Sequence, residues 1–98
     1  MGKYLLTWEL NIALTSVDAK ERKDSYALLS AVVKQDIESG LTKDWGMFVG
    51  EGSGYCVVEG SEVEVNLMTQ QYAPYANFKS HAVVSVEQAN EVIKSMTG

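Results

Sequence analysis

The sequence has little of the chemistry that metal sites, disulfides and anion recognition usually require. Its 98 residues include one cysteine, one histidine and one proline, and Arg22 is the only arginine. The single cysteine, Cys56, excludes an internal disulfide and a cysteine-ligated cluster within one chain. The single histidine, His81, excludes a histidine-based metal site within one chain. We therefore expect neither a metal nor a cofactor.

Positive charge is also scarce, because 8 basic residues stand against 13 acidic ones and the formal net charge is −5. A protein that follows a phosphate backbone needs a basic stripe, so nucleic-acid binding is disfavoured. No apolar run approaches the length of a membrane span, and the first ten residues are too short an apolar run for a signal peptide. A lone cysteine fits a reducing compartment, so we predict a cytoplasmic protein that does not enter membranes.

A glycine-rich stretch, FVGEGSGYCVVEG, occupies residues 48–60. A dinucleotide-binding loop needs glycines in the pattern G-x-G-x-x-G before a helix, but counting from Gly50 puts Tyr55 at the last position. A phosphate loop needs a lysine, and the stretch has none. We therefore predict a tight hairpin at residues 51–54 whose glycines supply positive φ angles.

Apolar residues alternate over 3–11, which predicts a strand with one apolar face formed by Tyr4, Leu6, Trp8 and Leu10. Asp18 followed three residues later by Glu21 predicts a capping box and a helix that runs to Ser39, where Gly40 can close it. The inner face of that helix is predicted to carry Tyr26, Leu29, Val33 and Ile37.

The second half of the chain predicts strands over 45–49, 55–59 and 78–84. Capping boxes at Ser61 and Ser85 predict a helix from 61 through 72 and a short C-terminal helix. The order β-α-β-β-α-β plus a helix specifies an α+β, ferredoxin-like sandwich, with residues 1–98 as one domain and a four-stranded antiparallel sheet. Two helices cover one face of such a sheet, so we expect a homodimer to form through the open face.

Four ionisable residues are predicted to share that open face: Glu9, Tyr55, Glu59 and His81. Imidazole can act as acid or base near neutral pH, a carboxylate can orient it, and a phenol can donate a hydrogen bond. These residues are therefore the candidate catalytic set. The alternative, which we favour, is that they pair with one another across a dimer interface or at its wet rim.

For several other side chains the sequence allows two interpretations, one functional and one structural. Trp8, Trp45 and Phe48 line either a ligand pocket or, as large aromatics in strands more often do, the core. Tyr72 and Tyr75 flank Pro74 and line either a pocket mouth or a packed loop. Cys56 lies in an apolar stretch, which favours an inert buried thiol over a nucleophile.

Three segments carry a resemblance to a known family: KYLLTWEL, DWGMFVGEGSGYCVVEG and YAPYANFKSHAVVSVEQANEVI. They combine a tryptophan in the first strand, a G-Y-x-x-V-E strand and a late V-x-S-V-E-Q segment. The chain resembles a family of small bacterial proteins of unknown function, itself similar to dimeric α+β-barrel proteins. The resemblance implies a ferredoxin-like dimer and transfers no catalytic residue.

Three functions remain open on this basis. The leading hypothesis is a homodimer that binds a small apolar or aromatic molecule, either between sheet and helices or between two sheets. The enzyme alternative is a cofactor-independent monooxygenase or isomerase that acts on a small aromatic or enolisable compound, with His81 as acid or base. The third is a regulatory module of the ACT type, which shares the same order of elements.

Overall fold

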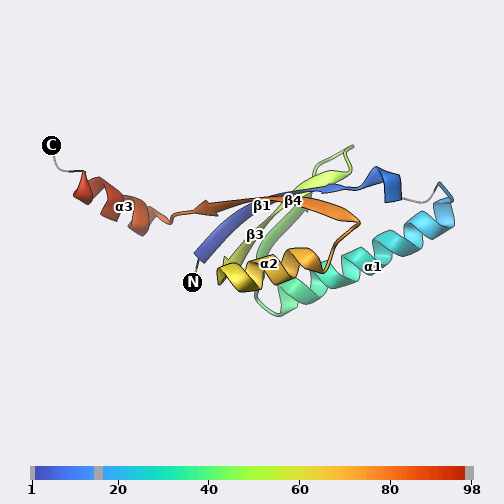
Figure 1. The fold of residues 1–98 in the computed structure, drawn as a ribbon, viewed down its shortest axis with the longest axis horizontal. Helices are drawn as coiled ribbons and strands as arrows, with labels where there is room; N and C mark the ends of the chain where they lie inside the picture. Colours follow the sequence, from blue (N-terminus) through green and yellow to red (C-terminus); the bar gives the residue numbers. More distant parts are fainter. Residues whose placement is uncertain (1, 15–16, 97–98) are drawn as a thin grey trace.

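A computed structural model describes residues 2–14 and 17–96 of the chain. Four antiparallel strands form one sheet in the order β2-β3-β1-β4, and α1 and α2 lie on one of its faces (Figure 1). This is the predicted ferredoxin-like α+β fold. The elements are β1 (Gly2–Leu10), a short 3-10 helix η1 (Ile12–Leu14), α1 (Ala19–Glu38), β2 (Thr42–Met47), β3 (Ser53–Gly60), α2 (Glu62–Gln70), β4 (Ala76–Val83) and α3 (Val86–Ser95).

Strand β1 is one of the two inner strands and pairs with β3 on one side and β4 on the other. Leu6 and Trp8 are buried beneath the helices, whereas Leu5, which directly precedes Leu6, is 37% exposed. Alternate residues of a strand point to opposite faces of its sheet. The predicted assignment of the two faces is therefore confirmed.

The hairpin between β2 and β3 differs from its prediction. Strand β2 begins at Thr42 and ends at Met47, and the Phe48 amide donates to the Ser53 carbonyl at 2.8 Å to close the turn. Within this hairpin only Gly50 has a positive φ, of 78°. Gly54 was expected in the turn for the same reason, but it lies inside β3 and serves a different purpose: the indole of Trp8 packs directly over it.

Helix α1 begins after Asp18, whose side chain accepts a hydrogen bond from the Lys20 amide at 3.2 Å. At its other end Gly40 has the expected left-handed conformation, with φ of 86°. The predicted inner face was partly wrong, because Ile37 is 47% exposed. Tyr26 is 41% exposed but faces the sheet, and the same side of the helix carries Leu29, Val32, Val33 and Asp36.

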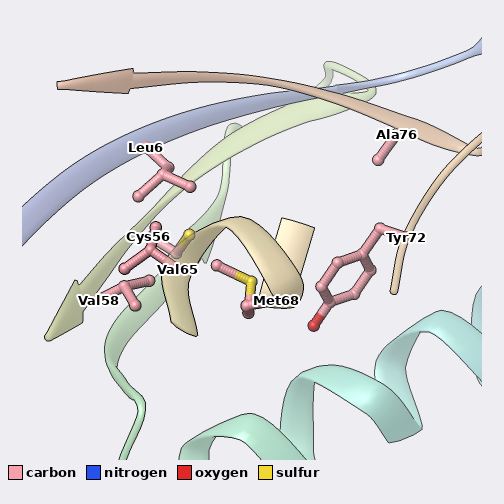
Figure 2. Close-up of a cluster of buried hydrophobic side chains, with 7 residues drawn as sticks. All are labelled: Leu6, Cys56, Val58, Val65, Met68, Tyr72 and Ala76. Carbon is pink, nitrogen blue, oxygen red and sulfur yellow. The ribbon is translucent and has the colours of Figure 1, made fainter. Parts of the chain in front are cut away.

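Helix α2 packs Val65 and Met68 against the sheet and completes a small buried cluster (Figure 2). Both predicted capping boxes in this half of the chain are present. The Ser61 hydroxyl accepts from the Glu64 amide at 3.1 Å, and the Ser85 hydroxyl accepts from the Gln88 amide at 3.2 Å. The buried cluster consists of Leu6, Cys56, Val58, Val65, Met68, Tyr72 and Ala76.

Helix α3 lies beyond the end of β4, away from α1 and α2 (Figure 1). Its apolar residues recur at helical spacing on one side, and Val86, Ile93 and Met96 are 74%, 62% and 74% exposed. The helix contributes to an elongated molecule with extents of 61 × 26 × 20 Å. The amphipathic pattern read from the sequence is thus real, although within the chain α3 does not bury its apolar side.

We predict that Gly54→Ala destabilises the fold by about 1–3 kcal/mol, the usual cost of forcing extra volume into a packed site. A Cβ at this position would collide with the Gly46 carbonyl and with the Trp8 ring. Gly52→Ala is the matched control, since its nearest side chain is Leu10 at 3.9 Å and its φ is not positive. Urea unfolding of both variants tests this, and equal stability would contradict it.

Candidate functional site

A cavity of about 240 Å³ lies between the sheet and α1. Its floor comes from β1, β2, β3 and β4, and its roof from α1 residues such as Leu29 and Val33. Tyr26 and Met47, which are 41% and 55% exposed, also line it and mark where it opens to solvent. A space of this size suits a small ligand, since sites for larger molecules run to about 300–1,000 Å³.

Aromatic side chains make up much of the cavity wall. Trp8 and Trp45 stack with ring centroids 5.5 Å apart and an angle of 12° between planes. Tyr72 and Phe78 form a tilted pair at 5.6 Å. The Trp8 indole N–H donates to the Tyr55 carbonyl at 3.3 Å, which holds the ring in place. The cavity wall therefore presents aromatic rings whose orientations are held by stacking and, for Trp8, by a hydrogen bond.

One residue of the cavity wall leads to a buried carboxylate. Tyr72 lines the cavity and turns its hydroxyl toward α1 (Figure 2), where it donates to Asp36 Oδ2 at 2.8 Å. The side-chain amide of Gln71 donates to Asp36 Oδ1 at 3.4 Å. Asp36 is only 5% exposed, so a carboxylate lies one hydrogen bond behind the cavity wall.

Two groups that line the cavity have shifted acidities. Burial, followed by the hydrogen bond to Asp36, raises the pKa of the Tyr72 hydroxyl far above its usual range. Burial also raises the pKa of the Cys56 thiol to about 11, and the negative charge of Asp36 adds to the effect. The thiol therefore stays protonated at neutral pH and is a poor nucleophile, in agreement with the expectation of an inert cysteine.

The predicted catalytic residues lie on the opposite face of the sheet and do not converge. His81 pairs with Leu5 of β1, Tyr55 pairs with Thr7, and Glu59 pairs with Lys3. Glu9 is six residues from Lys3 along β1, so roughly 20 Å of strand separates it from the level of Glu59. His81 lies two strand spacings, about 10 Å, from β3.

Two of these four residues have other partners. The Tyr55 hydroxyl donates to Asp44 Oδ2 at 3.0 Å, and Lys43 lies 3.8 Å from Glu59. His81 is exposed on the open face. The four residues thus share a surface without forming an assembled acid–base group in one chain, and an enzymatic role for His81 stays a prediction.

The aromatic residues for which the sequence offered a pocket or a packed position have different outcomes. Trp8 and Trp45 line the cavity, whereas Phe48 belongs neither to the cavity nor to the core: it is 39% exposed and packs against Tyr55 with ring centroids 6.3 Å apart. Tyr72 lines the cavity as well, while Tyr75 is 48% exposed and does not.

Sequence reasoning missed Asp36. A signal for it exists, because Asp36 follows Leu29 by seven residues and Val33 by three, which is the spacing of one helix face. The more apolar Ile37 beside it outweighed that signal. No spacing rule connects Asp36 to Tyr72, which lies 36 residues away.

The fold and the cavity define the class: a ferredoxin-like α+β domain with an apolar pocket between its sheet and its helices. The chain belongs to the family described as a domain of unknown function, DUF3303, whose model matches residues 2–97. A search of curated proteins gives no match.

Two further findings bear on the kind of site. Within residues 2–14 and 17–96, no group of three or more histidine, cysteine, aspartate or glutamate side chains is arranged to hold a metal ion. No helix in the same described part of the chain has the length and apolar character needed to cross a membrane.

We predict that the stability of the protein falls as pH rises from about 9 to about 11, in part because of Cys56. The folded thiol has the higher pKa, so its contribution is complete below the unfolded pKa and is lost as pH rises through the folded one. Urea unfolding across this range should show a steeper loss for the wild type than for Cys56→Ala. Parallel pH dependences would contradict this assignment.

Proposed function

We propose that the protein binds a small apolar or aromatic molecule in the cavity between sheet and helices. The observation that carries this proposal is the cavity itself, which is walled by apolar and aromatic side chains and opens at Tyr26 and Met47. Protein interiors normally fill such space, since an empty volume forfeits the contacts of its lining. A ligand that stacks on the aromatic wall would restore those contacts.

The composition of the cavity also argues for binding over catalysis. Its titratable lining groups are two tyrosines and Cys56, and the thiol is held in its neutral form. Neither an activated nucleophile nor a base poised near neutral pH lines the described cavity, and such groups are what acid–base or covalent chemistry requires. Recognition of a ligand by shape and stacking needs only what is present.

The binding proposal is tested with 2-phenylethanol, a neutral molecule with one aromatic ring. We expect it to shift the indole N–H resonances of Trp8 and Trp45 in a titration followed by NMR, because both rings line the cavity. Ser30→Phe, which places a ring at a lining position of α1, should weaken binding at least about tenfold by occupying the space.

Ser25→Phe is the matched control, since Ser25 lies on the same helix, is exposed and does not line the cavity. Indole resonances that remain unchanged at millimolar ligand would refute binding in the cavity. Equal weakening by both variants would show that the molecule binds elsewhere.

We further propose that the protein is a homodimer whose two copies meet through the open sheet face. Leu5, Val57 and His81 lie side by side there, and Leu5 is 37% exposed. From the spacing of strands and residues, four strands of about eight residues cover an area of roughly 500 Å² if the face is treated as flat. The side chains that project from it add to this area. That is the same order as the 800 Å² or so that each partner buries in a standard interface.

We expect light scattering at micromolar concentration to give the mass of two chains for the wild type and of one chain for Val57→Lys. A lysine at the centre of the covered face would leave a buried, unpaired charge. Leu28→Lys is the control, because Leu28 is 72% exposed on α1, on the other side of the sheet. A monomeric wild type, or a Val57→Lys variant that stays dimeric, would remove the dimer proposal.

A further inference from the structure

The cavity has a distinct electrical character as well as an apolar wall. Its described lining contains no lysine, arginine or histidine, so it offers no positive charge to a carboxylate or a phosphate. Asp36 is hydrogen-bonded at 2.8 Å to the lining residue Tyr72. A ligand group beside Tyr72 is therefore close to a negative charge that lies behind the wall.

The Asp36 carboxylate is held by two neutral donors. Tyr72 and Gln71 donate one hydrogen bond to each of its oxygens, and among the described residues no lysine, arginine or histidine forms an ion pair with it. Carboxylates that are this deeply buried are usually paired with a cation, because neutral donors compensate only part of the lost hydration. The charge thus lacks a positive partner within the described chain.

The direction of the Tyr72 hydrogen bond defines what a ligand group finds beside this residue. The hydroxyl proton points to Asp36, so the oxygen has lone pairs left to accept from a donor in the cavity. A donor N–H at that position would extend the chain of hydrogen bonds to the carboxylate. A hydrogen-bond acceptor at the same position would face the oxygens of Tyr72 and Asp36, and the hydroxyl proton between them is already donated to Asp36.

The aromatic wall favours the same sign of charge. Trp8, Trp45, Tyr26, Tyr72 and Phe78 all line the cavity. The face of an aromatic ring carries partial negative charge and attracts an ammonium group, most strongly when water is excluded. Stacked rings and a buried carboxylate are two independent features that both select for a cation.

We propose that this cavity is selective for small aromatic amines in their protonated form, with the ring against Trp8 and Trp45 and the ammonium group at Tyr72, one hydrogen bond away from the Asp36 carboxylate. The inference rests on the proposed function, since it names the ligand class for the same cavity. Moving an ammonium group out of water is costly, and here the carboxylate and the ring faces offset that cost.

The test compares three ligands that share one ring and a short side chain: 2-phenylethylamine, 2-phenylethanol and 3-phenylpropionate. Their dissociation constants are measured by calorimetry near neutral pH with the whole chain. We expect the amine to bind at least about tenfold more tightly than the alcohol, and the acid to bind more weakly than the alcohol, because the site holds negative and no positive charge.

Asp36→Asn removes the charge and keeps the shape of the side chain. We expect it to reduce the advantage of the amine to within about threefold of the alcohol, while the affinity for the alcohol changes little. Tyr75→Phe is a control for the removal of a polar group nearby, since Tyr75 lies outside the cavity, and it should preserve the ranking.

If Asp36→Asn does not fold, the order of the three affinities in the wild type still tests the proposal. Equal affinities for the three ligands, or tightest binding of the acid, would overturn the amine proposal and leave small-molecule binding intact. An amine preference that survives in a folded Asp36→Asn protein would remove Asp36 from the explanation and overturn the proposal as stated. Failure of all three ligands to bind would count against the binding function itself, and the amine proposal would fall with it.

Discussion

The close approach of Trp8 to Gly54 determines the inner surface of the sheet. The two residues face each other on β1 and β3, and only the missing side chain of the glycine lets the indole lie across the neighbouring strand. Beyond Gly54 the ring stacks on Trp45 of β2. The contact between β1 and β3 therefore also positions the aromatic side chain of β2. The cavity above it inherits its floor from this arrangement.

A second pair repeats the device on the opposite face. The ring of Tyr55 lies against Gly46 of β2, where any added Cβ would collide with it, and Phe48 packs alongside. Glycine in a strand interior usually weakens it, but an aromatic ring from a neighbouring strand can cover the exposed backbone. Both faces of this part of the sheet thus owe their shape to glycines that are needed for close packing and not for turns.

The sequence predicts the order of elements, the sheet and the assignment of faces, because those follow from the alternation along β1 and from local caps such as Ser61 and Ser85. It predicts less well where function depends on long-range partners. The burial of Asp36 in preference to Ile37 is understandable only once the Tyr72 hydroxyl is known to meet it. Likewise, alternation placed His81 and Glu59 on one face, but only the strand order and register separate them. Distances across a sheet are not encoded in local patterns.

The cavity also has a thermodynamic meaning for the whole domain. A chain of 98 residues has little core to spare, and leaving about 240 Å³ beside that core sacrifices packing that the fold could otherwise use. A molecule that enters this space acts as a missing piece of the interior, held between sheet and α1. Under the proposed function, occupancy and folding would be one coupled equilibrium, in which the amount of free ligand would set how much of the protein stays folded.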